Sequence, residues 1–276
     1  MASAKDIVVK PISAKAASTL VKRVHYSGKT VQNSQLHLGV YLGGKIEGAM
    51  QFGPSLDKRK IQGLVEGTGW NGFIELNRMA FSERLPRNSE SRAIAIAMKL
   101  IRKHYPGIEW VISFADGTQC GDGTIYRASG FVLTGIKANN SIWRAPNGES
   151  FAETALRPGI GGSKAIAKAE AISRTTMTEG KQLDASGGKS SMQRFKDAGW
   201  EPIPGYQLRY IYFLNKYARQ RLTVPILPFS KIEEMGAGMY KGEKVSREKQ
   251  AMTGTTGTAT GQHRSSRSNS DEVSDA

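Results

Sequence analysis

FIELNRMAF at residues 73–81, SESRAIAIAMKLIRKH at residues 89–104 and EWVISFA at residues 109–115 are the segments that decide the fold. The first alternates apolar and polar residues, which predicts a β-strand with one buried face. The second repeats apolar residues at the spacing of one helical face. The third is a mostly apolar run, which is typical of a strand buried on both faces. A strand, a helix and a second strand in this order predict a sheet with helices packed on it.

Similar patterns extend the prediction to both sides of this stretch. The fold class that they predict is α+β, with a mixed, twisted central sheet flanked by helices. In chain order we expect a strand over 7–10, a helix over 13–24, a β-hairpin over 36–52 with a Gly43-Gly44 turn, a loop over 54–72, a short helix over 124–129, a strand over 131–136, a helix over 165–174 and a strand over 206–214 that returns to the sheet.

Composition divides the chain into four parts. We expect a core over residues 1–145, a basic, Gly-rich insertion over 146–205, the return strand and the end of the core over 206–240, and a tail over 241–276. The tail has almost no large apolar residues, so it is predicted to be disordered.

The charge balance favours an anionic partner. The 276 residues include 39 Lys and Arg against 24 Asp and Glu, which gives a formal net charge of +15. Such an excess attracts phosphate backbones and anionic cofactors. A single Cys excludes an internal disulfide framework and fits a reducing cytoplasm. No segment has the roughly 18 consecutive apolar residues of a membrane helix, and we expect no secretory signal.

The start of the helix predicted from residue 89 is a candidate anion site. Free N–H groups and the helix dipole attract phosphate at such a position. Arg84 and Arg87 flank this helix start, and Asn88, Ser89 and Ser91 add hydrogen-bond donors. The alternative is an ordinary helix that Asn88 or Ser89 caps, with solvated arginines beside it.

Asp116 and the segment GDGTIYRASGF at residues 121–131 resemble the end of the CoA-binding core in the GNAT superfamily of N-acetyltransferases. In that superfamily a Tyr four residues before a Gly-Phe pair often protonates the departing CoA thiolate, and Tyr126 has this spacing. The resemblance implies acetyl-CoA or a related acyl-CoA as cofactor. The implied cofactor-binding residues are Phe81, Arg87, Asn88, Ser89 and Ser91, although RNSES at residues 87–91 replaces the usual Gly-rich loop.

A narrower resemblance rests on five short segments: HYSG at 25–28, ELNR at 75–78, RNS at 87–89, SFAD at 113–116 and GTIY at 123–126. Together they resemble the Mom family of phage DNA-modification proteins, over about residues 7–136. The resemblance implies an enzyme in the host cytoplasm that transfers an acetamide (methylcarbamoyl) group to the N6 atom of adenine in double-stranded DNA. The modification protects phage DNA from host restriction enzymes.

The resemblance also implies roles for residues. Asp116 is the expected general base or the group that holds the N6 amine, and Tyr126 is the expected acid toward the leaving group. From the residues alone, Asp116 equally suits an Asx-turn before Gly117, and Tyr126 equally suits the core. The target adenine is expected to flip out of the duplex.

His25, Tyr26 and Arg78 are expected to organise the pocket. The alternatives are a structural His25 and an Arg78 that pairs with Glu75 on the same strand. Iron held by His25 and Asp116 is a family-level expectation.

Two basic regions are candidate DNA contacts. Lys58, Arg59 and Lys60 form one, and the insertion supplies the other with Lys164, Lys168 and Arg174. Spread cations of this kind position a phosphate backbone without reading sequence, and the alternative for both is a solvated surface. Trp70, Trp143 and Trp200 suit either base stacking or packing. Two other functions stay open: an ordinary N-acetyltransferase for a small amine or a protein, and a non-catalytic DNA-binding protein.

Overall fold

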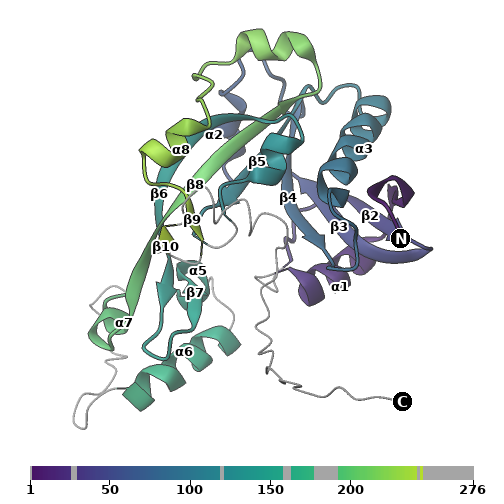
Figure 1. Ribbon diagram of the computed structural model, residues 1–276. Helices are drawn as coiled ribbons and strands as arrows, with labels where there is room; N and C mark the ends of the chain where they lie inside the picture. Colours follow the sequence, from purple (N-terminus) through teal and green to yellow (C-terminus); the bar gives the residue numbers. More distant parts are fainter. Residues whose placement is uncertain are drawn as a thin grey trace, which may run out of the picture.

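The computed structural model describes residues 2–25, 30–118, 121–157, 163–176, 192–240 and 243–244. An eight-stranded sheet has the order β1-β2-β3-β4-β5-β8-β6-β7 (Figure 1). Only β4 and β5 pair in parallel within this sheet, and the other neighbours are antiparallel. The predicted α+β class with a mixed sheet is confirmed.

The elements have the following bounds. The strands are β1 (Val8–Pro11), β2 (Leu36–Leu42), β3 (Lys45–Gly53), β4 (Phe73–Phe81), β5 (Trp110–Asp116), β6 (Val132–Arg144), β7 (Ser150–Ala152), β8 (Glu201–Phe213) and the separate pair β9 (Met239–Tyr240) and β10 (Glu243–Lys244). The helices are α1 (Ala14–Val24), α2 (Lys58–Gln62), α3 (Ser89–His104), α4 (Thr124–Ala128), α5 (Glu153–Leu156), α6 (Ser163–Thr176), α7 (Gln193–Asp197) and α8 (Ser230–Glu234), with 3-10 turns η1 (Ala4–Asp6) and η2 (Lys216–Arg221).

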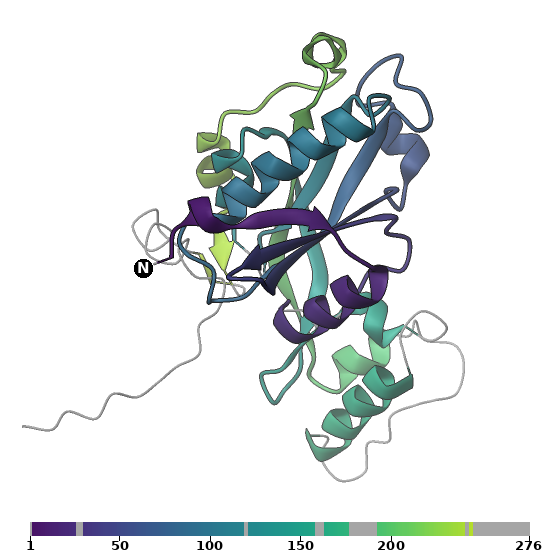
Figure 2. The same ribbon diagram turned by 90° about the vertical axis from the view of Figure 1, so that its right-hand side faces the viewer.

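Helices cover both faces of the sheet. The apolar side of α3, including Ile94 and Met98, packs on one face together with Leu76 and Val111. On the opposite face, α1 packs over β2, β3 and β4. Figure 2 shows α1 and α3 on either side of the N-terminal strands. Because side chains alternate along a strand, each central strand contributes to both layers.

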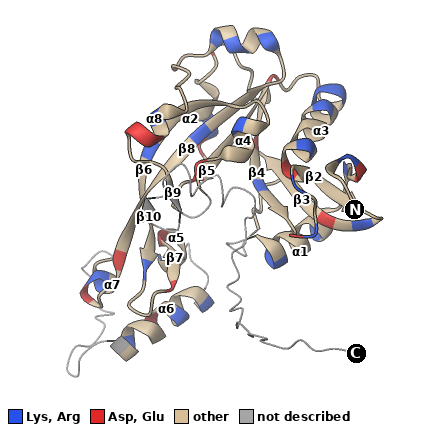
Figure 3. Cartoon of the chain, viewed as in Figure 1, with Lys and Arg blue, Asp and Glu red and all other residues tan. Residues whose placement is uncertain are grey.

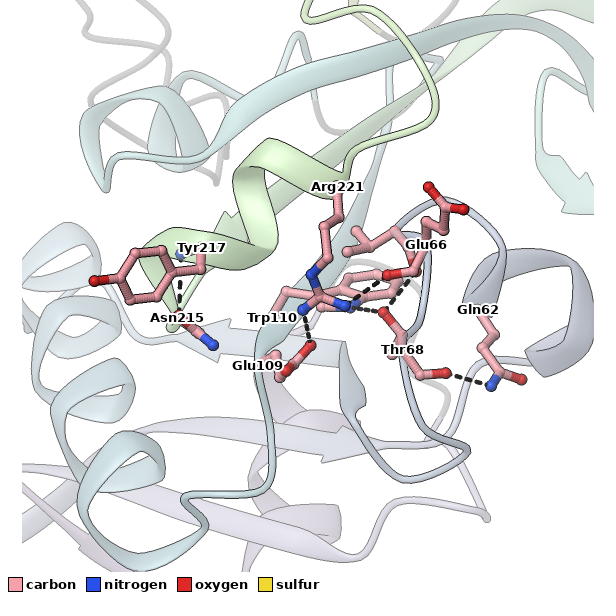
Figure 4. A network of polar contacts seen from close by, with 9 residues as sticks. Gln62, Glu66, Thr68, Glu109, Trp110, Asn215, Tyr217 and Arg221 are labelled. Carbon is pink, nitrogen blue, oxygen red and sulfur yellow. Dashed lines mark hydrogen bonds and ion pairs between the residues drawn. The ribbon is translucent and has the colours of Figure 1, made fainter.

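The segment over 54–72 is not the simple loop that its polar, Gly-rich sequence predicts. It contains the five-residue helix α2, whose start is capped by Asp57, and it buries Val65. Trp110 Nε1 donates to Thr68 Oγ1 at 3.0 Å. Arg221 of η2 bonds to the Glu66 carbonyl at 2.6 Å and to the Glu109 carboxylate (Figure 4). These contacts fix the segment against the sheet.

Strands β6 and β8 are both longer than the predicted 131–136 and 206–214. Their outer halves pair from Ile142↔Ile203 to Arg144↔Glu201, so β8 runs across the expected junction at 205/206. Beyond them β7, α5, α6 and α7 form a lobe at the far end of the sheet (Figure 1). The lobe has its own apolar cluster, in which Trp143 and Trp200 are buried. Packing, not base stacking, therefore explains these two Trp residues.

The expected tail over 241–276 lies outside the described residues, apart from 243–244. Within the described part of the chain, no helix combines the length and apolarity needed to cross a bilayer.

Candidate active site

The two central strands separate partway along their length. Strands β4 and β5 pair from Phe73↔Trp110 to Glu75↔Ile112. At the next step the buried Ser113 hydroxyl donates to the Leu76 carbonyl at 3.2 Å, in place of a backbone bond. From there β4 continues along β3, and β5 continues along β8. Beyond this point the two strands therefore move apart toward their carboxyl ends. Ligands of open sheets commonly bind at the carboxyl ends of the strands, in such a gap.

A β-bulge sets the direction of the polar side chains on β4. Gln51 pairs with Arg78 and Phe52 with Leu76, so Asn77 is the extra residue. The bulge puts Glu75 and Arg78 on one face although they are three positions apart. Bulges next to active sites commonly re-aim a side chain in this way.

Asp116 lies on the same face of the sheet as Glu75 and Arg78. The rings of Phe73 and Trp110 stack with centroids 4.5 Å apart, so they share a face. Glu75 is two residues beyond Phe73, and Asp116 is six residues beyond Trp110, so strand alternation puts both on that face. Two carboxylates and one guanidinium group thus share the face of the sheet on which β4 and β5 part.

His25 joins this group from the end of α1. Its backbone N–H donates to the Val21 carbonyl at 2.9 Å and closes the last turn of the helix. Burial, with a smaller contribution from the Arg78 charge, lowers the pKa of His25 to about 4. The imidazole is therefore neutral at pH 7, and one of its ring nitrogens is able to accept a hydrogen bond. Tyr26 lies outside the described residues.

Asp116 makes the Asx-turn that its sequence context also predicts. Its Oδ1 accepts from the Thr118 N–H at 3.0 Å. The turn fixes the carboxylate at the end of β5, so the Asx-turn at Asp116 is present. The role of Asp116 as general base or as the group that holds the N6 amine stays a prediction.

Tyr126 lies on the α3 side of the sheet, opposite the Asp116 face. Its ring packs between Phe131 and Tyr210, at centroid distances of 5.4 and 5.3 Å. The position of α4 is set by Asp122, which accepts from the Thr124 N–H at 3.1 Å and pairs with Arg127 at 2.8 Å. Tyr126 is half-buried, so both the packing role and the predicted acid role are compatible with its position.

The start of α3 differs from an ordinary capped helix. Asn88 has a left-handed backbone with φ of 68° and makes no side-chain cap bond, so the expected capping by Asn88 is wrong. Ser89 does not cap it either, because its fully buried hydroxyl has no partner among the described residues. The Ser91 hydroxyl donates to the Asn88 carbonyl at 3.2 Å. Within the part of the chain that the structure describes, no side chain therefore caps the first turn of α3, as at an anion site, although the Ser89 N–H itself donates to the Pro86 carbonyl at 3.1 Å.

The other predicted cofactor residues lie around this helix start. Phe81, at the end of β4, packs against the core, and Arg87 is exposed. Arg84 reaches the buried Glu47 at 3.6 Å, which directs it to β3.

The predicted DNA-contact residues differ in exposure and in the partners of their charged groups. Lys58 donates to Asn71 Oδ1 at 3.1 Å and lies 4.5 Å over the half-exposed Trp70 ring, whereas Arg59 and Lys60 are exposed. In the lobe, Lys164 is exposed, Lys168 pairs with Glu149, and Arg174 lies 3.8 Å from Glu170. Figure 3 shows Lys and Arg spread over many elements.

Comparison with known proteins identifies the family. Residues 6–231 match the Mom protein family. The chain belongs to this family. It is 37% identical over 223 residues to the methylcarbamoylase Mom of Escherichia phage Mu, which covers 80% of this chain and 81% of that protein.

Solved structures give a weaker likeness to this Mom-family chain. A Bacillus subtilis acetyltransferase in complex with CoA is 8% identical with a TM-score of 0.37, covering 75% of this chain and 97% of that one. The Escherichia coli ribosomal-protein-S18-alanine N-acetyltransferase is 13% identical with a TM-score of 0.36, covering 52% and 88%. Scores of this size transfer no residue roles, so the family assignment rests on the sequence relationship.

Family membership confirms the resemblance to the Mom family, and the structure adds Glu75 to the candidate site. Burial raises the pKa of Glu75, and its neighbours Asn77 and Arg78 act in the opposite direction. The ELNR segment contains this residue, but alternation alone predicts Arg78 on the opposite face from Glu75. The bulge that unites them has no evident signal in the sequence.

The iron expectation gains no support from the described residues. Among them, no three His, Cys, Asp or Glu side chains come together as a metal site. Cys120 lies outside the described part.

Proposed function

We propose that this Mom-family protein transfers a methylcarbamoyl group to the N6 atom of adenine in double-stranded DNA. The observation that supports it most is the 37% identity to the methylcarbamoylase Mom of phage Mu over most of both chains. The polar group at the divergence of β4 and β5 suits this reaction. The adenine N6 lone pair is delocalised into the ring, so the nucleophile needs a base and a preorganised site.

In the proposed reaction, a new bond forms between N6 and the methylene carbon of a CH2–CO–NH2 group, while the bond between that carbon and the leaving group of the donor breaks. Asp116 accepts the N6 proton, and Tyr126 donates a proton to the leaving group from the other side of the sheet. Neutral His25, together with Glu75 and Arg78, holds the flipped base. The start of α3 is the proposed site for the pyrophosphate of a CoA-type donor that carries this group, because Ser89 and the first-turn N–H groups suit that anion.

The test uses the isosteric substitution Asp116→Asn, which keeps an oxygen for the Thr118 turn bond and removes the base. The full chain is expressed beside a plasmid, and the plasmid is digested to nucleosides for mass spectrometry. We expect a deoxyadenosine heavier by an acetamide group less one hydrogen, and a loss of at least about 100-fold in this product for Asp116→Asn.

Asp6→Asn on η1 is the matched control and is expected to keep full activity. Unmodified plasmid with soluble wild-type protein would reject the proposal and favour an ordinary N-acetyltransferase, for which acyl-CoA binding and small-amine acceptors are then measured.

A further inference from the structure

Arg209, in the middle of β8, is a half-buried cation without an acidic partner among the described residues. Its Nε donates to Thr134 Oγ1 at 3.0 Å and its Nη2 to the Thr134 carbonyl at 2.7 Å. Within the described residues no carboxylate forms an ion pair with it. Burial lowers the pKa of Arg209. A partly buried charge with only neutral partners is costly unless an anion joins it.

The neighbouring strand is shaped around this guanidinium. Strand β6 has a register shift at Thr134, after which Gly135 pairs with Arg209. A Cβ at Gly135 would lie 3.1 Å from Arg209 Nη2, so the absence of a side chain there makes room for the group. Thr134 and Gly135 thus fix the guanidinium group of Arg209 in one orientation. The N–H groups that Thr134 does not use stay available, which is the preorganisation that bidentate phosphate binding needs.

Arg209 shares the face of Asp116. Phe114 pairs with Arg209, and Asp116 pairs with Gln207, so alternation puts Arg209, Gln207 and Asp116 on one side. Arg209 is diagonal to Asp116, at a typical separation of about 7–8 Å between such positions. On β6, the exposed Lys137 lies opposite Gln207 in the strand register and adds a second cation on this face.

We propose that Arg209 and Lys137 bind the phosphate backbone of the DNA strand that carries the target adenine, next to the flipped nucleotide. This inference rests on the proposed function and adds a contact surface to it. The opposite face holds α3 and Tyr126, so a phosphate of the acyl donor at the α3 start would lie across the sheet from Arg209. The residues predicted as DNA contacts from sequence do not include either cation.

The test measures binding of a DNA duplex to the full chain at several salt concentrations. Each lost phosphate contact lowers the slope of log K against log salt by about 1. We expect this drop, with roughly tenfold weaker binding to any sequence, for Arg209→Gln and for Lys137→Gln. Arg209→Lys is expected to restore the slope only in part, because it lacks the fork. Lys99→Gln, exposed on α3, is the matched control.

Each outcome distinguishes the contact surface from the proposed reaction. Unchanged slopes in a folded Lys137→Gln variant and a folded Arg209→Gln variant would overturn the surface even if the wild-type protein modifies adenine. Weaker acyl-CoA binding with unchanged DNA binding in Arg209→Gln would overturn it as well and reassign the arginine to the donor. Reduced slopes with unmodified wild-type plasmid would support the surface and reject the reaction.

Discussion

The two faces of strands β4 and β5 differ in what they carry, although the same nine and seven residues build both. On the α3 side, Leu76 and Val111 are buried in the main apolar cluster. On the α1 side, Glu75, Arg78 and Asp116 lie where the strands part. Both faces carry buried apolar residues, since Phe73, Trp110 and Ile112 form a cluster on the second one. Only that second face also carries Glu75, Arg78 and Asp116, so the comparison separates a purely apolar layer from one that combines packing with titratable groups.

The largest expected effect comes from the apolar face. Ile94 of α3 is fully buried in the main cluster. Ile94→Ala should lower the free energy of unfolding by about 3–4 kcal/mol, because it removes buried methyl groups and leaves a cavity. Urea unfolding with a fluorescence readout measures the loss. The half-exposed Ile226→Ala is the control and should cost under about 0.5 kcal/mol. An equal loss in both variants would contradict the assigned core.

The apolar face is also the part that the sequence predicts best. The alternation in 73–81 and the helical spacing in 89–104 predict β4 and α3 with their observed bounds. Both signals are local, because burial of one face is written into consecutive residues. The α1 face depends on the Asn77 bulge, which arises from pairing between β3 and β4. A register shift depends on two distant segments, so Glu75 could not be placed in the site beforehand.

Pairing between distant segments likewise explains the longer β6 and β8. Residues 137–141 are Lys, Ala, Asn, Asn and Ser, which alone favour a turn more than a strand. They become strand because 201–207 lie beside them. The two cations of the proposed phosphate surface are on these strands, which is why the sequence did not single them out.

The second prediction tests the polar face through pH. The pKa of His25 falls from 6.5 to about 4 on folding, so the unfolded chain binds more protons between these values. The contribution of His25 to stability is therefore complete above pH 6.5 and is lost as the pH falls toward 4, by about 3 kcal/mol in total. Urea unfolding at several pH values compares wild type with His25→Asn, which should lack this loss.

Glu75 makes the comparison with His25→Asn necessary. Its raised pKa stabilises the folded state at low pH, and this contribution is lost as the pH rises through the folded value. The contributions of the two groups to stability thus change in opposite directions with pH. His104→Asn, exposed at the end of α3, is the control. A parallel pH dependence of wild type and His25→Asn would show that His25 is not buried in its neutral form.

The smallest expected effect concerns the start of α3, a polar feature assigned to the apolar side together with Tyr126. The Ser89 hydroxyl is buried without a partner among the described residues, so Ser89→Ala should leave stability unchanged or raise it by about 1 kcal/mol. Acyl-CoA binding, measured by calorimetry, should weaken about fivefold, because one hydrogen bond to the anion is lost. Thr19→Ala, exposed on α1, should leave this binding unchanged. A less stable Ser89→Ala protein with unchanged binding would make the hydroxyl structural and would remove the start of α3 from the proposed donor site.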